Sequence, residues 1–373
     1  MNIVLFCHAI NQISGASKVC IQMASYWAEK GHSVTILSHY GLPESHYPVS
    51  SKVKLKTAGI ISKYVPNKIV CNLLSPFLLP SLYSTIKNEN IDLIITNNAP
   101  YYGLLYATLL SWLTKIPVII WKHAGHFMKS SPMYKVTRKL CFPKADAIVL
   151  LTEGDEKHAS ELSRNCFTIK NPAEQTDFTD EIQKEQNRET DNDNTALFVG
   201  RLAEQKSVDH LIHAWKKAIP EIPQWKLLIV GDGEKRGKLE SLAKRLHISK
   251  SVLFVGEVKN VQPYYKKAAF FVMSSMYEGL PVSLIEAVSN GLPLISYNCP
   301  YGPENVIEHN KNGLLIESGN INALSEAIIK MATSYDMRKT FSNASKIKSN
   351  EFLLGPIAEQ WDKVFEFVLK KTG

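Results

Sequence analysis

The sequence predicts an α/β protein with two doubly wound parallel sheets, and three observations support this fold class. A chain of 373 residues has room for two domains of ordinary size. Short apolar runs alternate with longer amphipathic runs, a pattern typical of strand–helix–strand units. The alternation stops at residues 174–194, where eight acidic and two basic residues indicate a linker.

The first half of the chain opens with a predicted strand, helix and strand at Ile3–Cys7, Ala16–Lys30 and Ser33–Leu37. No element is predicted for residues 41–90, because their periodicity is unclear. Beyond them we expect three strands, at Asp92–Thr96, Val118–Trp121 and Ala147–Leu150. A helix at Tyr102–Trp112 is predicted between the first two of these strands.

The second half shows the same alternation more clearly. Its predicted strands are Ala196–Val199, Lys226–Val230, Val252–Val255, Ala269–Met273 and Pro293–Ser296. The helical periodicity between and after them covers Val208–Ala218, Lys235–Leu246, Val261–Ala268, Val282–Ser289 and Ile321–Met331. Strands separated by helices imply right-handed crossovers and a parallel sheet.

The expected domains are residues 1–172 and residues 195–355, joined by a polar linker at residues 173–194. Residues 356–373 form an amphipathic helix around Trp361, which could return to pack on the first domain. Ligands of doubly wound sheets bind beyond the carboxyl ends of the strands. We therefore expect the active site in the cleft between the domains.

Composition excludes several classes of protein. With 45% hydrophobic and 21% charged residues, the chain is not disordered. None of its six cysteines forms a Cys-x-x-Cys pair, so neither structural zinc nor a disulfide framework is expected. No signal peptide is visible, and the longest apolar stretch, Tyr101–Leu113, is too short to cross a bilayer. We expect a cytoplasmic protein, either soluble or peripheral on a membrane.

The positive charge is confined to the first half of the chain. Residues 1–172 hold 18 basic and 9 acidic residues, a net charge of +9, whereas the remainder has a net charge of −1. An anionic membrane, an anionic acceptor or a nucleic acid would explain this asymmetry, and so would chance. A nucleic-acid partner is disfavoured, because no recognition helix or aromatic–basic motif is found.

The strongest local motif runs from Tyr277 to Ala287, directly after a predicted strand. Pro281 suits the first position of a helix, and the free amides of that helix end would attract an anion. An ordinary capped helix with Glu278 and Glu286 in solvent is the alternative. Eight helical residues would separate Glu278 from Glu286 by about 12 Å along the helix axis. This distance is too long for the paired acid and base of a glycosidase, so we expect the two glutamates to hold different parts of one ligand.

A second motif, Gly200–Lys206, also leaves a strand, and its Arg201 and Lys206 could converge on an anion. A third loop, Gly231–Gly233, follows another strand. The next glycine is Gly237, which misses the dinucleotide fingerprint by one residue and disfavours a nicotinamide site.

From Gly200 to Leu315 the chain resembles the retaining glycosyltransferases of family 4, which have the two-domain GT-B fold. The resemblance rests on an ordered set of motifs: Gly200-Arg201-Leu202 with Lys206, Val230–Gly233, Phe254–Gly256, Glu278–Pro281 with Glu286, Gly291–Pro293, Cys299–Glu304 and Asn312–Leu315. The first domain matches more weakly, through Gly15, His123 and the segment Lys144–Val149 before Glu153.

The resemblance implies a role for each matching residue. The donor diphosphate would be bound by Gly15, Arg201, Lys206, Gly279 and Leu280. Val258 would contact the nucleotide base and Glu286 the ribose hydroxyls. Glu278 and His123 are the implied catalytic residues, with Glu278 holding the donor sugar and His123 touching it near the reaction centre. His126 competes with His123 for the second role.

One departure concerns the first loop, which reads Ser14-Gly15-Ala16 where the family usually has two adjacent glycines. Ser14 therefore puts the phosphate contact of this loop in question. The sequence shows no nucleophile and no Asp-x-Asp metal clamp outside the linker. The resemblance thus implies transfer with retention, without a metal or other cofactor.

The expected reaction moves a hexose or N-acetylhexosamine from a nucleotide sugar to a glycan or lipid-linked acceptor in bacterial surface polysaccharide assembly, such as lipopolysaccharide. The segment Cys299–Glu304 resembles that of enzymes that use UDP-sugars. A sugar-nucleotide epimerase of the same fold and a non-catalytic sugar-binding protein remain alternatives, which donor turnover would test.

Two basic clusters in the first domain predict docking on the anionic inner face of the cell membrane. The first combines Lys52, Lys54, Lys56, Lys63 and Lys68 with Ile60, Ile61 and Val65. The second combines Lys129, Lys135, Arg138, Lys139 and Lys144 with Phe127, Met128 and Tyr134. A soluble enzyme with a basic acceptor pocket is the alternative.

Overall fold

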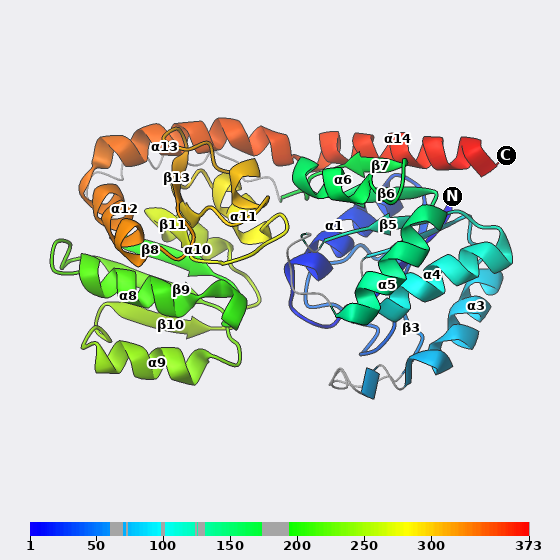
Figure 1. Cartoon of the computed structure of the whole chain (residues 1–373), viewed down its shortest axis with the longest axis horizontal. Coiled ribbons are helices and arrows are strands. Elements are labelled where there is room, and N and C mark those ends of the chain that lie inside the picture. Colours follow the sequence, from blue (N-terminus) through cyan, green and yellow to red (C-terminus); the bar gives the residue numbers. More distant parts are fainter. Residues whose placement is uncertain are drawn as a thin grey trace. The chain divides into compact units, whose positions relative to one another are not determined.

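The computed structural model describes residues 1–59, 70–71, 74–97, 101–123, 125, 131–173 and 194–372. They divide into two compact units, residues 1–170 with 355–373 and residues 171–354. Figure 1 shows that each unit has its own sheet flanked by helices. Of the expected linker, residues 173–194, only Ala173 and Asn194 are among the described residues. Ala173 belongs to the second unit, and its N–H donates to the Phe352 carbonyl.

The first unit has a seven-stranded parallel sheet in the order β3-β2-β1-β4-β5-β6-β7. Its strands are β1 (Asn2–Cys7), β2 (Ser33–Ser38), β3 (Val53–Thr57), β4 (Leu93–Thr96), β5 (Val118–Trp121), β6 (Ala147–Leu150) and β7 (Cys166–Thr168). Its helices are α1 (Gly15–Glu29), α3 (Leu79–Asn88), α4 (Tyr101–Thr114), α5 (Pro132–Cys141), α6 (Glu153–Ala159) and α14 (Leu354–Thr372).

The second unit has a six-stranded parallel sheet in the order β10-β9-β8-β11-β12-β13. The strands are β8 (Thr195–Val199), β9 (Lys226–Val230), β10 (Val252–Gly256), β11 (Phe270–Met273), β12 (Leu294–Tyr297) and β13 (Gly313–Ile316). The helices are α8 (Val208–Ala218), α9 (Arg236–Arg245), α10 (Gln262–Lys267), α11 (Val282–Ser289), α12 (Ile321–Thr333) and α13 (Tyr335–Lys348).

Both sheets reverse direction of winding once, between β1 and β4 in the first unit and between β8 and β11 in the second. Loops that leave the two central strands diverge at such a point and open a space at the carboxyl edge of the sheet. This topology decides which motif residues come together in each unit.

The last helix, α14, packs on the first unit through aromatic side chains. The Trp361 ring lies 5.3 Å from that of Trp27 and 4.8 Å from that of Trp121, measured between centroids. All three indoles are buried, so the C-terminal residues complete the core around β5 and α1. Burial of this kind contributes about 1.5–3 kcal/mol for each large apolar side chain.

Residues 41–90, for which no element was predicted, contain regular structure: β3, an edge strand, and α3. One expectation needs correction: Pro281 is the N-cap of α11 and not its first helical residue. Glu278 therefore precedes the helix, and the helical rise of about 12 Å does not measure its separation from Glu286.

Candidate active site

The second unit brings a lysine and a glutamate together at its winding reversal. Lys206 follows β8 and Glu278 follows β11, and these strands are neighbours in the sheet. The Lys206 Nζ lies 2.6 Å from the Glu278 Oε1, with the two side chains only 17% and 9% exposed. A charge pair this short and this shielded from water is a strong interaction, and it orients both groups.

Three hydrogen bonds fix the loop of Lys206 against the loop of Glu278. The Gln205 side-chain amide donates to the Tyr277 carbonyl at 2.7 Å, and the Met276 N–H donates to the Gln205 carbonyl at 3.0 Å. The Ser274 hydroxyl donates to the Lys206 carbonyl at 2.8 Å. The two loops are thus held together by contacts other than the Lys206–Glu278 pair itself.

Two motif glycines allow these loops to pack closely. A Cβ on Gly231, whose φ is +133°, would lie 2.0 Å from the Gly200 carbonyl oxygen. A Cβ on Gly302 would lie 2.2 Å from the Gly279 carbonyl oxygen. The glycines of the Gly231–Gly233 and Cys299–Glu304 motifs are therefore explained by contact between loops.

The amino end of α11 follows Glu278 directly. The amides of Val282 and Ser283 have no acceptor within the helix, as at any helix start, and Pro281 has no N–H. Gly279 and Leu280 are buried beside this end. The Asn171 side-chain amide lies 3.5 Å from the Leu280 carbonyl and helps to orient it. Together with the helix dipole, this end can stabilise negative charge.

Glu286 lies within α11 and is only 7% exposed. Its Oε2 accepts a hydrogen bond of 2.9 Å from the Tyr265 hydroxyl. Burial, reinforced by the charge of Glu286, raises the pKa of Tyr265 well above its usual value, so this phenol stays a donor. Both glutamates are buried, which excludes the alternative of two solvent-exposed carboxylates on an ordinary capped helix.

Arg201 and Val258, the other two predicted donor contacts of this unit, do not join the pair. Arg201 is exposed and forms no ion pair with any residue that the structure describes. Val258 is half-buried in the loop after β10. Both remain candidate ligand contacts.

In the first unit, the predicted phosphate loop is the start of α1. Ser14 is the N-cap and its hydroxyl accepts from the Ser17 N–H at 3.1 Å, while Gly15 is exposed at the first helical position. The departure from two adjacent glycines thus has a structural reason: Ser14 caps the helix, a task that serine performs well.

His123 is half-buried after β5, with its ring centroid 4.4 Å from that of Trp121. Its Nε2 lies 3.8 Å from the Cys20 Sγ. Sequence reasoning missed Cys20, because a lone cysteine in a helix reads as a core residue. His126, the competing candidate, lies outside the described residues.

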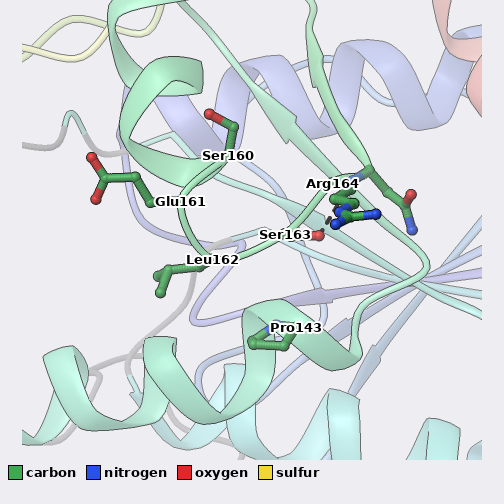
Figure 2. Close-up of a pocket in the computed structure, with 7 residues that line it drawn as sticks. Pro143, Ser160, Glu161, Leu162, Ser163 and Arg164 are labelled. Atoms are coloured by element: carbon green, nitrogen blue, oxygen red, sulfur yellow. Dashed lines mark hydrogen bonds between the residues drawn. The ribbon is translucent and has the colours of Figure 1, made fainter.

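A small pocket also occurs in the first unit, lined by residues 160–165 and Pro143 (Figure 2). These residues precede β7 and β6, so the pocket lies at the amino edge of the sheet, opposite to Gly15 and His123. It is not the candidate active site. In the described parts of both units, no three His, Cys, Asp or Glu side chains gather as metal ligands.

Comparison with known protein families matches each half of the chain to a glycosyltransferase family model. Residues 179–348 match the family model described as glycosyl transferases group 1, and residues 13–168 match that described as glycosyltransferase family 4.

Two curated relatives align along nearly the whole chain. The amylovoran biosynthesis glycosyltransferase AmsD of Erwinia amylovora is 25% identical, over 97% of this chain and 99% of its own. An α-1,4-N-acetyl-D-galactosaminyltransferase of Campylobacter jejuni, named for an undecaprenol-diphosphate-linked acceptor, is 26% identical over 94% of each chain.

Among solved structures, HepE of Anabaena in complex with UDP superimposes with a TM-score of 0.76. It is 17% identical and is covered in full by 98% of this chain. The likeness confirms the predicted fold of two Rossmann-like domains, the GT-B fold.

Proposed function

The chain belongs to glycosyltransferase family 4, and on this premise we propose that it transfers a hexose or N-acetylhexosamine from a nucleotide sugar to a glycan or lipid-linked acceptor. The setting would be bacterial surface polysaccharide synthesis. The observation that carries the proposal is the buried Lys206–Glu278 pair, held at the winding reversal where a ligand of this fold class binds. AmsD and the Campylobacter jejuni enzyme support the setting by their names.

In the second unit, the donor diphosphate would lie against Lys206, Arg201 and the amino end of α11 with Gly279 and Leu280. Lys206 would then exchange its contact with Glu278 for a phosphate oxygen. The freed Glu278 would accept hydrogen bonds from hydroxyls of the donor sugar. A buried carboxylate gains most from such bonds, because it would otherwise be left without a partner.

At the other end of α11, Glu286 would accept hydrogen bonds from the ribose hydroxyls, and the Tyr265 hydroxyl would keep its carboxylate in position. Val258 would contact the nucleotide base. In the first unit, the start of α1 at Gly15 would approach the diphosphate, and His123 would contact the donor sugar.

We propose that transfer proceeds with retention. The bond between the sugar C1 and the diphosphate oxygen breaks, and its electron pair leaves with the diphosphate. The acceptor hydroxyl oxygen bonds to C1 on the same face, and its proton passes to a diphosphate oxygen. Lys206, Arg201 and the α11 amides would stabilise the growing negative charge, the role that a metal fills elsewhere. No metal or other cofactor is needed for these steps.

UDP is the proposed nucleotide, because HepE has been crystallised with UDP and with UDP-glucose. The test is release of nucleoside diphosphate from a panel of UDP- and GDP-sugars, with the anomeric configuration of the product read by NMR. Turnover with inversion at C1 would refute the mechanism. Binding without any release would favour a non-catalytic sugar-binding protein.

We also propose that the first unit docks on the anionic inner face of the cytoplasmic membrane. No helix among the described residues is long and apolar enough to span a bilayer, so contact would be made by a surface. The first basic cluster offers little, because Lys52 pairs with Glu29 while Lys54 and Lys56 pair with Glu89. The other members of that cluster, residues 60–68, lie outside the described residues.

The second basic cluster supports docking better. Residues 93–145 contain seven basic residues and no Asp or Glu. Within this stretch, α5 exposes Met133, Val136 and Leu140 by 55%, 53% and 57%, and the same helix also exposes the cations Lys135 and Lys139. Its neighbour α4 exposes apolar side chains as well, Trp112 among them. Phe127, Met128 and Lys129 lie outside the described residues.

An apolar row with cations beside it on the same helix fits the boundary between lipid headgroups and acyl chains. Each lysine near such a surface contributes about 1 kcal/mol, so two to four of them with a few apolar side chains suffice for reversible binding.

A further inference from the structure

Four side chains meet at the carboxyl edge of the first sheet. Cys7 ends β1, Asn97 follows β4 and His123 follows β5, and these three strands are adjacent. Cys20 reaches the same place from α1, and it is fully buried. The four residues come from four separate elements, so the fold and not the local sequence assembles them.

Cys20 is the centre of this group. The Asn97 side-chain amide donates a hydrogen bond of 3.0 Å to its Sγ, and the His123 Nε2 lies 3.8 Å away. The Cys7 thiol is the third polar neighbour of the same sulfur. A buried structural cysteine usually behaves as a small apolar side chain. A sulfur with three polar neighbours is instead arranged as an acceptor.

The electrostatics agree with the geometry. Burial raises the pKa of Cys20, but the hydrogen bonds with Cys7, His123 and Asn97, together with the charge of His123, outweigh it and lower the pKa to about 5. The hydrogen bond to Cys20, with burial, raises the pKa of Cys7 well above its usual value, so Cys7 keeps its proton and donates. Cys7 and His123 are the titratable groups that face Cys20, and Asn97 is uncharged.

In this arrangement the Nε2 atom of His123 is occupied by its contact with Cys20. With Nε2 on Cys20 and the ring against Trp121, Nδ1 is the nitrogen that has no partner among the described residues. A hydrogen bond to one ring nitrogen fixes both the ring orientation and the tautomer of the other.

We propose that Cys20 is a positioning residue: its buried sulfur holds His123 by Nε2 and leaves Nδ1 as the nitrogen available to a substrate. The contact itself stands on geometry, whereas its importance for turnover rests on the role of His123 in the proposed function.

The test compares Cys20→Ala, Cys20→Ser and the control Cys141→Ala, which removes an equally buried thiol from α5. The ring nitrogen resonances of His123, identified by their loss in His123→Gln, report the contact directly by NMR. We expect Cys20→Ala to shift them and Cys141→Ala to leave them unchanged. If the alanine variant fails to fold, Cys20→Val fills the space of the thiol without a polar atom and serves instead.

Turnover is measured with whichever sugar nucleotide the release assay identifies. Loss of a group that orients a functional histidine typically lowers activity about 10- to 100-fold. We expect a fall of this size in kcat for Cys20→Ala with an unchanged KM for the donor, and partial recovery in Cys20→Ser, whose hydroxyl can still accept.

Three results would overturn the proposal. Unchanged His123 resonances in Cys20→Ala would refute the contact, whatever the activity. Shifted resonances with wild-type kcat would refute the positioning role. An equal loss of kcat in Cys141→Ala would show that any buried thiol matters only for packing. If no sugar nucleotide is turned over, the proposed function and the role in turnover fall together, while the NMR result still decides the contact.

Discussion

Replacing Lys206 by methionine separates what this side chain does for folding from what it does for the donor. The substitution leaves Glu278 buried, 9% exposed, without its partner. Removing one member of a buried pair costs about 3–5 kcal/mol, and because Lys206 itself is 17% exposed we expect the lower end, about 3 kcal/mol. At about 2–4 °C per kcal/mol for a domain of this size, the melting temperature of the second unit should fall by about 6–12 °C.

The double variant Lys206→Met with Glu278→Gln completes the experiment. Glutamine removes the orphaned charge while it keeps the size of the side chain, so most of the lost stability should return. Donor turnover should not return, because the proposed contacts of Lys206 with the diphosphate and of Glu278 with the sugar are both gone. Thermal unfolding followed by calorimetry and release of nucleoside diphosphate measure the two effects on the same samples.

Two outcomes would refute this reasoning. If the double variant is no more stable than Lys206→Met, the 2.6 Å pair does not shield a buried charge. If Lys206→Met keeps wild-type turnover at saturating donor, the pair belongs to the scaffold and the diphosphate binds elsewhere.

Glu286→Ala should weaken UDP binding about 10- to 150-fold by calorimetry, because hydrogen bonds to a charged acceptor contribute about 1.5–3 kcal/mol; unchanged affinity would remove Glu286 from the site. Tyr265→Phe should weaken it less, since it removes only the 2.9 Å bond that orients the carboxylate; a loss as large as that of Glu286→Ala would argue against this order. Arg201→Ala should lower kcat without lowering the melting temperature, because the exposed guanidinium forms no ion pair with the described residues; wild-type turnover would mark it as a surface residue. Val136→Glu and Lys139→Glu should each reduce co-sedimentation with anionic liposomes, and salt should weaken binding of the wild type; equal pelleting with neutral liposomes would refute electrostatic docking.

Five of the six strands of the second unit could be predicted almost to the residue, as with β9 at Lys226–Val230, because buried parallel strands are continuous apolar runs. The sixth, the edge strand β13 at Gly313–Ile316, was not predicted. The edge strand β3 could not be recognised in the same way. Its sequence, Val53-Lys54-Leu55-Lys56-Thr57, alternates lysines with apolar residues, and both lysines pair with the distant Glu89. Alternation was the available signal, and it is weak over five residues.

For the candidate site, sequence identified the residues but not their partners. Lys206 and Glu278 are 72 positions apart, and nothing local indicates that they pair. Their meeting follows once β8 and β11 are known to be neighbours, which is a property of the sheet order. Cys20 and Asn97, 77 positions apart, escaped notice for the same reason, since neither belongs to a motif.

The same physical logic operates in both units. In each sheet, the two strands at the winding reversal deliver polar residues to one point: Lys206 and Glu278 after β8 and β11, Cys7 and Asn97 at the ends of β1 and β4. Buried polar groups of this kind persist only when every member has a partner, because each unpaired one costs about 1–3 kcal/mol. In the second unit the partners are opposite charges, which a charged ligand can displace. In the first unit they surround a single sulfur, which no ligand needs to displace. A displaceable ion pair suits a unit that binds the charged donor. A sulfur that keeps its partners suits a unit that holds His123 in one orientation.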